Sequence, residues 1–181
     1  DPEKAIDDAL LDRMTDCLTH RGPDDRGTLR STFQLRPPYE SQPGVALGHR
    51  RLSIIDVDGG RQPISNEDET VWVICNGEIY NFPALRQRME GSGHKFKTNS
   101  DTETIVHLWE DEGLNGFRHL IGMFAIAIWD SRERKLILAR DRLGQKPLFY
   151  RHEPARLIFG SELKSILAVP DVPREIDRGS L

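Results

Sequence analysis

The chain has 181 residues, of which 37% are apolar, and its 25 basic and 29 acidic residues give a formal net charge of −4. This length suits one compact domain with a buried core, and the well-mixed charges argue against a nucleic-acid surface or an anionic membrane as partner. No apolar run approaches the roughly 20 residues that a membrane span needs.

The cysteines and histidines set further limits. Cys17 and Cys75 are too few for a disulfide framework, so we expect a reducing, cytoplasmic compartment. The six histidines show no metal-ligand pairing with cysteine or aspartate, and we therefore expect no metal site. The chain begins "DPEKAIDD" without a methionine or a signal peptide, which favours a fragment or a processed form.

The first half of the chain mixes a helix with extended segments. Residues 3–19 are predicted to form an amphipathic helix, because apolar residues recur there at helical spacing. The helix ends before "HRGPDDRG", whose glycines and proline break regular structure, and three prolines exclude a central strand over 36–44. "VALGHRRLSIID" (45–56) is then predicted to be extended, and "VWVIC" (71–75) to be a buried strand.

Two helices and four strands are predicted for the second half. "FPALRQRMEG" (82–91) has its proline near the first turn of a short helix. "NSDTETIVHLWEDEG" (99–113) places Ser100 and Glu103 at capping-box spacing ahead of an apolar stripe, which predicts a second helix. Four strand-like runs follow, "MFAIAIWD", "KLILARD", "PLFYR" and "RLIFG", and then a last helix, "ELKSILAV".

The strand pattern predicts the fold class. Short connections between the later strands favour an antiparallel meander. "MFAIAIW" and "VWVIC" do not alternate apolar with polar residues, so each must be covered on both faces. Two stacked antiparallel sheets with helices outside meet that requirement, and we expect an α+β, four-layer αββα sandwich.

The stretch "CNGEIYN" (75–81) carries the strongest hint of chemistry. Asn76-Gly77 is the pair most typical of a tight hairpin, but "EIYNFPALRQ" turns helical too soon for a second strand. The alternative is a strand end that presents an amide and a glycine N–H to a ligand. Such donors form oxyanion holes, where losing one costs about 3–4 kcal/mol of transition-state stabilisation. Cys75 and Cys17 are interpreted as inert core thiols.

Six motifs, in one order, carry a resemblance to a known family. They are "HRGPDDRG", "GHRRLSIIDVDGGRQPI", "VICNGEIYNFPALRQRME", "FKTNSDTETIVHLWEDEG", "GMFAIAIWD" and "LILARDRLGQKPLFY". From about His20 to Lys164 the chain resembles the glutaminase domain of glutamine-dependent asparagine synthetases, a class II glutamine amidotransferase. The resemblance implies an N-terminal-nucleophile hydrolase fold, which is the same αββα sandwich.

The resemblance also implies a mechanism. In such domains an N-terminal cysteine thiolate attacks the side-chain amide of glutamine, and its own α-amine serves as base and then acid. The motifs assign the oxyanion hole to the Asn76 side chain and the Gly77 backbone N–H. No residue of this chain matches the nucleophile, which in the family lies on a short strand ahead of the first helix. Because Asp1 already falls in that helix, we expect the sandwich to lack its first strand and the chain as written to be inactive.

The same motifs assign the substrate-binding residues. Arg51 would hold the glutamine α-carboxylate, Glu78 and Asp101 the α-ammonium group, and backbone groups near Ile54 would complete the cage. Taken singly, each has a simpler interpretation. Arg51 alone is typical of an exposed salt-bridge partner, and Asp101 of a carboxylate that favours a helix start.

The resemblance implies a larger parent protein. Residues 1–170 are expected to form the amidotransferase domain, and 171–181 to begin a linker to a C-terminal synthetase domain that would use ATP and Mg²⁺ to amidate aspartate. This chain has no P-loop and needs no cofactor of its own. The partners expected are glutamine and the synthetase domain, and a homodimer is compatible with the sequence. The alternatives are a catalytically silent domain that is structural or binds an amino acid, and an amidotransferase for another acceptor.

Overall fold

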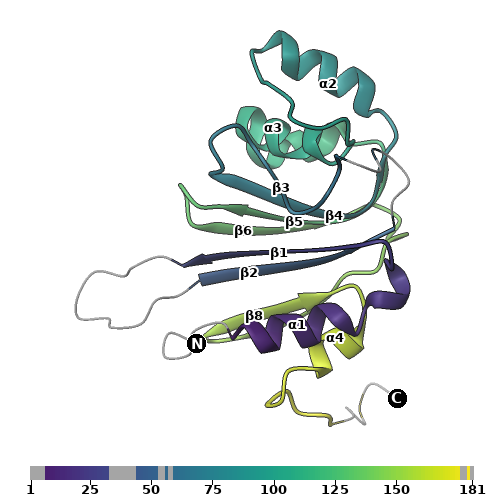
Figure 1. The fold of residues 1–181 in the computed structure, drawn as a ribbon, viewed down its shortest axis with the longest axis vertical. Coiled ribbons are helices and arrows are strands. Elements are labelled where there is room, and N and C mark those ends of the chain that lie inside the picture. The colour runs from purple at the N-terminus through teal and green to yellow at the C-terminus, as the bar shows by residue number, and fades with distance from the viewer. Residues whose placement is uncertain (1–6, 33–43, 53–55, 57–58, 176–178, 180–181) are drawn as a thin grey trace, which may run out of the picture.

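A computed structural model of the chain describes residues 7–32, 44–52, 56, 59–175 and 179. The elements form four layers, in which helices cover both outer faces of two stacked layers of strands (Figure 1). The predicted α+β sandwich of antiparallel sheets is therefore confirmed. No helix among the described residues is long and apolar enough to cross a membrane.

The helices and strands follow one another in this order: α1 (Asp8–Asp16), η1 (Thr19–Arg21), β1 (Asp25–Thr32), β2 (Gly44–Arg51), β3 (Ile64–Ser65), β4 (Val71–Ile79), α2 (Phe82–Gly91), α3 (Glu103–Glu112), η2 (Gly113–His119), β5 (Gly122–Asp130), β6 (Lys135–Arg140), β7 (Phe149–Glu153), β8 (Arg156–Gly160) and α4 (Leu163–Leu167).

The larger sheet has the antiparallel order β3-β4-β5-β6 and is buried on both faces. All seven residues from Phe124 to Asp130 of β5 are buried, as its unbroken apolar run predicts. Because side chains alternate along a strand, one set faces α2 and α3 and the other faces the second layer of strands. Val73, Cys75 and Ile126 belong to the first set and Ile74 and Ala127 to the second.

The second layer consists of two separate hairpins among the described residues, β1-β2 and β7-β8. Leu47 of β2 and Phe159 of β8 pack with Ile74 and Trp129 of the larger sheet, so an apolar cluster joins the two layers. A third cluster lies on the far side of β8, where Ile158 packs against residues of α1 and α4. Each interface between layers thus has its own core.

Helix α1 begins where the Asp7 side chain accepts a hydrogen bond from the Ala9 N–H at 3.0 Å, as an N-cap residue does. Its helical spacing was predicted over 3–19, but residues 1–6 lie outside the described part of the chain. Strand β7 begins two residues later than the predicted run, and α2 ends at Gly91 as predicted within one residue.

Strand β1 was not predicted, because Gly27 was interpreted as a breaker. In the structure a Cβ on Gly27 would lie 1.7 Å from the carbonyl oxygen of Gln62. The glycine therefore permits a close approach of two backbones within a regular strand that pairs along its whole length with β2.

The predicted capping box of α3 is wrong in its geometry. The Glu103 carboxylate accepts hydrogen bonds from the N–H groups of Lys97 and Thr98, at 2.6 and 2.7 Å, and does not return to Ser100. Ser100 Oγ accepts from the Thr102 N–H at 3.2 Å. Glu103 is fully buried and fixes the segment before the helix, because the chain folds back over the first helical turn.

Candidate active site

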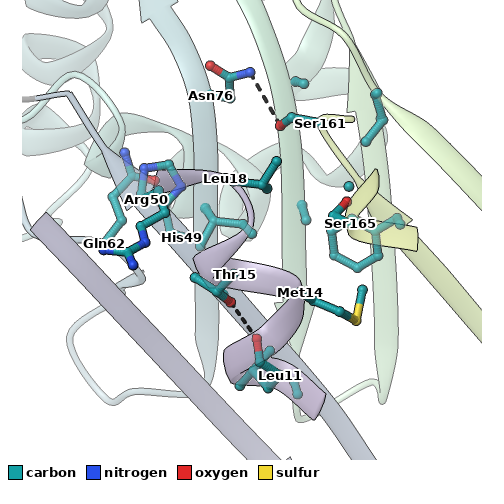
Figure 2. Close-up of a pocket in the computed structure, with 18 of the residues that line it drawn as sticks. Leu11, Met14, Thr15, Leu18, His49, Arg50, Gln62, Asn76, Ser161 and Ser165 are labelled. Carbon is teal, nitrogen blue, oxygen red and sulfur yellow. Dashed lines mark hydrogen bonds between the residues drawn. The ribbon is translucent and has the colours of Figure 1, made fainter. Parts of the chain in front are cut away.

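A cavity of about 1160 Å³ is bordered by β2 and β8 of the second layer, by β4 and β5 of the larger sheet and by α1. Its walls come from α1, β2, β4, β5 and β8, with α4 at one side, and Figure 2 shows side chains from these elements around it. Part of the wall is apolar, with Leu11 and Met14 of α1 facing Ile158 of β8. The rest is polar and contains all of the described residues that the sequence assigns to catalysis and binding: Arg51, Asn76, Gly77, Glu78 and Asp101.

Two strands bring those polar residues face to face. On β2, Arg51 follows Leu47 and His49 on the face toward the larger sheet, because residues two apart share a face. On β4, Asn76 and Glu78 follow Ile74 on the face toward β2. The inner faces of β2 and β4 thus combine an apolar core at one end with polar groups at the other.

The Asn76-Gly77 pair lies inside β4 and not at a turn. Asn76 pairs with Ala125 and Gly77 with Phe124, and the strand continues to Ile79. The hairpin interpretation is therefore wrong, and the strand extends four residues past the predicted end. The pair still lines the cavity, as the alternative interpretation requires.

Different features fix the positions of Asn76 and Gly77, a side-chain hydrogen bond for Asn76 and the backbone conformation for Gly77. The Asn76 Nδ2 donates a long hydrogen bond of 3.5 Å to Ser161 Oγ just after β8, and Figure 2 shows the amide nitrogen directed toward that side chain. Gly77 has φ of 152°, and a Cβ there would lie 2.0 Å from the Met123 carbonyl oxygen. Only glycine fits this position, so its backbone approaches β5 closely while the residue stays exposed.

Arg51 is 7% exposed at the end of β2. Its Nη2 donates a hydrogen bond of 2.6 Å to the backbone oxygen of Asp56. The Asp56 carboxylate in turn accepts from the Gly59 N–H and the Asn99 N–H, at 3.1 and 2.8 Å. Asp56 thus links the Arg51 side chain to the segment that precedes α3. Arg51 is buried and held, unlike the exposed partner that its simpler interpretation requires.

Asp101 is 5% exposed and lies just before α3. Its Oδ2 accepts a hydrogen bond of 2.8 Å from the Ile79 N–H at the end of β4. This contact holds the carboxylate beside Asn76, Gly77 and Glu78. Buried carboxylates are rare without partners, and the Asp101 side chain is positioned by β4 as well as by its own helix.

Neither cysteine has the surroundings of a reactive thiol. Cys75 is 3% exposed and points into the cluster under α2 and α3, on the face of β4 opposite Asn76. Burial, with the Asp101 carboxylate, raises the pKa of the Cys75 thiol strongly. Burial also raises the pKa of Cys17, whose Sγ donates to the Met14 carbonyl at 3.1 Å. The interpretation of Cys75 as a core thiol is confirmed, whereas Cys17 is only half-buried.

Gln62 is a site residue that the sequence did not reveal. The register of β3 with β4, extended by two residues, places Gln62 opposite Cys75. Its side chain there replaces a backbone partner: Oε1 accepts from the Cys75 N–H at 2.6 Å, and Nε2 donates to the Cys75 carbonyl at 3.2 Å. Nε2 also lies 3.4 Å from Thr102 Oγ1. Gln62 therefore joins β4 to the start of α3 at Cys75, the residue that precedes Asn76.

His49 is another cavity residue without a sequence signal. Burial, with the nearby Arg51 guanidinium, lowers its pKa to about 4, although Asp25 acts in the opposite direction. The imidazole is therefore neutral at pH 7.

Ile54, assigned by resemblance to the amino-acid cage, lies outside the described residues. Away from the cavity, four possible metal ligands lie together around His107.

Comparison with known proteins identifies the family. The family described as "Glutamine amidotransferase domain" matches residues 2–181. Asparagine synthetase [glutamine-hydrolyzing] 3 of Bacillus subtilis is 42% identical over 94% of this chain, and the same organism's asparagine synthetase [glutamine-hydrolyzing] 2 is 44% identical over 93%. The aligned regions are 26% and 21% of those relatives, so the chain spans about a quarter of their length.

A solved structure titled as the allosteric regulatory enzyme of purine biosynthesis has the same fold. It superposes with a TM-score of 0.70 over 89% of this chain and 40% of its own, at 23% sequence identity. That similarity concerns the fold alone, whereas the family match covers nearly every residue. The chain belongs to the glutamine amidotransferase domain family.

Proposed function

We propose that the chain is the glutaminase domain of an asparagine-synthetase-like enzyme, which binds glutamine in the cavity and splits its side-chain amide into glutamate and ammonia. The observation that carries this proposal is the convergence of Arg51, Asn76, Gly77, Glu78 and Asp101 on one cavity. These residues come from β2, β4 and the segment before α3, and a shared ligand would account for their position around one cavity.

The ionic residues suit a free amino acid. The guanidinium of Arg51 offers a planar pair of donors to the α-carboxylate, which a lysine does less well. Glu78 and Asp101 offer negative charge to the α-ammonium group. Because Arg51 and Asp101 are less than a tenth exposed, their interactions with a bound zwitterion are little screened by water.

The chemical step places charge at Asn76 and Gly77. A thiolate adds to the amide carbon, and the oxyanion that forms accepts hydrogen bonds from the Asn76 Nδ2 and the Gly77 N–H. The leaving nitrogen takes a proton from the conjugate acid of the base and departs as ammonia, leaving a thioester. Water then hydrolyses the thioester to glutamate and regenerates the thiol.

The thiol itself is proposed to come from a segment that these 181 residues do not include. The Cys75 side chain packs in the cluster under α2 and α3, and the Cys17 Sγ donates to the Met14 carbonyl, so neither supplies it. The cavity is larger than the roughly 300–1,000 Å³ of most small-molecule sites. β2 and β8 each pair on one side only among the described residues and border this space, so an extended segment can add between them as a strand.

A second function is favoured by the state of the two cysteines. Without an activated thiol the same cavity can bind glutamine or glutamate and not turn it over. The chain would then serve as an amino-acid-binding domain, and the two proposals differ in hydrolysis but share the binding site.

The remaining parts of the proposal concern the parent protein. We propose that residues 171–181 begin a connection to a cytoplasmic synthetase domain that uses ATP and Mg²⁺ to amidate aspartate. Support comes from the two Bacillus subtilis relatives, of which the region shared with this chain makes up only 26% and 21%. Val172 is still buried in the cluster beside α4, so the packed part of the domain extends at least two residues past the predicted boundary at residue 170.

Calorimetric titration with L-glutamine and L-glutamate tests the binding site. We expect weak binding of both by the chain, and loss of that binding in Arg51→Ala. Arg88→Ala is the matched control, because Arg88 lies on the outside of α2 and pairs with Glu112 at 2.7 Å. Absence of heat with either ligand, or equal losses in the two variants, would refute the assignment of the cavity.

Glutamate release by the parent protein tests the chemistry. Asn76→Ala should lower kcat by about 10²–10³-fold with little change in KM, because an oxyanion donor acts in the transition state. Arg51→Ala should mainly raise KM, and Asn115→Ala, on the exposed η2 segment, should change neither. If the Asn76 and Arg51 variants show the same pattern, the roles assigned to them are wrong.

A further inference from the structure

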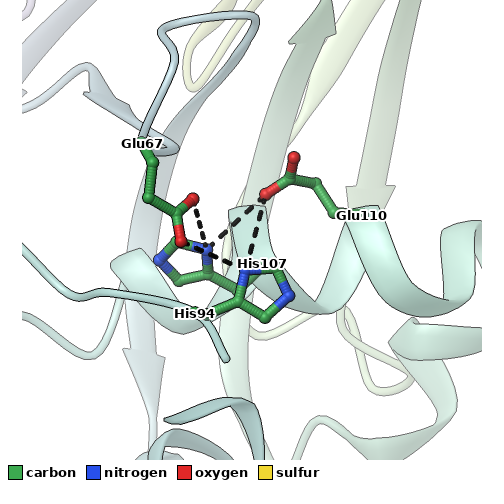
Figure 3. Close-up of side chains that lie close together, drawn as sticks. All are labelled: Glu67, His94, His107 and Glu110. Carbon is green, nitrogen blue, oxygen red and sulfur yellow. Dashed lines mark ion pairs between the residues drawn. The ribbon is translucent and has the colours of Figure 1, made fainter. Parts of the chain in front are cut away.

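A second group of chemical side chains lies on the outer side of the larger sheet, across β4 from the cavity. Glu67 belongs to the β3–β4 connection, His94 follows α2, and His107 and Glu110 lie three residues apart on α3. Each offers one ligand atom, and these four atoms all lie within 4.8 Å of one another (Figure 3). Residues three apart on a helix share a face, so α3 presents a histidine and a glutamate together.

Three of the four histidine–carboxylate separations in this His/Glu cluster match those of ligands around an ion, and the fourth, at 3.9 Å, is wider. The Nδ1 atoms of His94 and His107 lie 3.3 and 3.5 Å from the Glu67 oxygens, and 3.9 and 3.6 Å from Glu110 Oε2. Charge-assisted hydrogen bonds are shorter, at about 2.7–2.9 Å. Four ligands placed about 2.0–2.2 Å from a tetrahedral Zn²⁺ are about 3.3–3.6 Å apart.

A carboxylate lies behind each histidine, within hydrogen-bond distance at His94 and at ion-pair distance only at His107. The Nε2 of His94 lies 3.0 Å from Asp111 Oδ1, and the Nε2 of His107 lies 3.7 Å from Glu103 Oε1. Both Nδ1 atoms are left facing the centre of the cluster. Metal-binding histidines almost always give their second ring nitrogen to such a partner, which fixes the tautomer and the direction of the lone pair.

The glutamates are held in the same manner. Glu67 Oε1 accepts a hydrogen bond of 2.8 Å from the Lys95 N–H. Glu110 Oε1 accepts from Asn66 Nδ2 at 2.8 Å and from Arg132 at 3.3 Å. In each carboxylate one oxygen is thus held by the protein, while Oε2 is left to face the His107 ring.

Burial supplies an independent reason to expect an occupant. The His107 side chain is 0% exposed, and neither of its ring nitrogens makes a hydrogen bond with the described residues. Glu110 Oε2 is also buried without a hydrogen-bond partner. Buried polar atoms are normally satisfied, and two of these unsatisfied atoms, His107 Nδ1 and Glu110 Oε2, lie only 3.6 Å apart.

We propose that Glu67, His94, His107 and Glu110 bind a Zn²⁺ ion. Two imidazoles and two carboxylates are ligands that Zn²⁺ accepts, and the two carboxylates balance its charge, whereas Mg²⁺ prefers oxygen ligands alone. The ion has a structural role, because it joins the β3–β4 connection and the segment after α2 to α3. The residues before α3 include Asp101, so the ion also steadies one wall of the cavity.

The alternative to a metal ion in the cluster is a proton on the His107 imidazole. Burial alone would lower the pKa of His107, but Glu103, Glu110 and Glu67 together raise it to about 9. A cluster that holds only an imidazolium ion would bind no metal at neutral pH. Zn²⁺ must displace that proton, so its binding should release protons in proportion to the ion bound.

The test uses tag-free protein treated with a chelator and titrated with ZnCl₂ at neutral pH. We expect one Zn²⁺ per chain, proton release that varies with the buffer used, and a thermal midpoint raised by about 5–10 °C when free Zn²⁺ is 100 times its Kd. MgCl₂ at the same concentration should leave the midpoint unchanged. No binding of Zn²⁺ to the folded protein would overturn the proposal in favour of the proton.

Variants of Glu67 and His94 test where the ion binds. These two residues are chosen because replacing the fully buried His107 could unfold the protein. Glu67→Gln and His94→Gln should each weaken Zn²⁺ binding by at least 10-fold and remove the thermal shift. Glu69→Gln and His152→Gln are the matched controls, because both residues are exposed and lie outside the cluster. Equal binding in all four variants would place the ion elsewhere and refute the site.

Discussion

Replacing Gln62 with alanine tests whether its side chain completes the larger sheet. The variant removes an amide that accepts from the Cys75 N–H at 2.6 Å and donates to the Cys75 carbonyl at 3.2 Å. The contact with Thr102 Oγ1, at 3.4 Å, is too long to add much. The loss therefore falls on two backbone groups of a residue that is 3% exposed.

The size of the effect follows from those two groups. An unsatisfied buried donor or acceptor costs about 1–3 kcal/mol. Gln62 lines the cavity, so water can reach part of the space left behind, and the lower end of the range applies. We expect the free energy of unfolding to fall by about 2–3 kcal/mol, which lowers the thermal midpoint by about 4–12 °C in a chain of this size.

Urea unfolding followed by tryptophan fluorescence measures the change. Gln87→Ala is the matched control, because Gln87 is exposed on α2 and its replacement should stay within about 0.5 kcal/mol of the wild type. If Gln62→Ala were no less stable than Gln87→Ala, the side chain would not be acting as a strand partner, and the account of how β4 is held below Asn76 would be wrong.

Three further predictions address the core, the pH dependence and the thiols. Ile128→Ala, at a fully buried site of β5, should reduce the free energy of unfolding by about 2–5 kcal/mol in the same urea assay, and a smaller loss would contradict tight packing under α3. The pKa of His49 is lowered to about 4 in the folded chain, so its contribution to stability is present above pH 6.5 and is lost as the pH falls through 6.5 toward 4, by at most about 3 kcal/mol. The stability difference between wild type and His49→Gln should therefore change over that window, and a difference independent of pH would exclude the titration. A thiol reagent should label Cys17 slowly and Cys75 only in urea, so Cys75→Ala should leave the labelling of folded protein unchanged, whereas fast native labelling of Cys75 would contradict its burial.

The layers of the fold could be predicted because a strand that is buried on both faces has an unbroken apolar sequence. The unbroken apolar runs of β4 and β5 require cover on both sides, and the structure provides α2 and α3 on one side and a second layer of strands on the other. β1 has no such apolar run. Its sequence, "DRGTLRST", is polar, and its structure comes from pairing with β2 and from the contact of Gly27 with Gln62.

The candidate site was predicted from residue type at Asn76-Gly77 and from the family motifs at Arg51, Glu78 and Asp101. Gly77 and Asn76 stand out because an exposed amide beside an obligatory glycine suits an oxyanion. Gln62 and Asp56 gave no signal, since their roles depend on register and on a backbone oxygen that sequence periodicity does not encode. The His/Glu cluster was missed for a related reason: its ligands lie on three separate segments, and only His107 and Glu110 have a spacing that a helix brings together.

The alternation along β4 explains how one strand can serve both the core and the site. Its odd-numbered residues, such as Val73 and Cys75, pack under the helices, while Ile74, Asn76 and Glu78 face the cavity. A shift of register by one residue would bury Asn76 and turn the Cys75 thiol toward the substrate. The Gln62 side chain opposes that shift, because it binds both backbone groups of Cys75 and of no other residue on β4. The face of β4 that lines the cavity is thus fixed in register by a residue on the neighbouring segment, so we expect the removal of the Gln62 side chain to lower the stability of the fold.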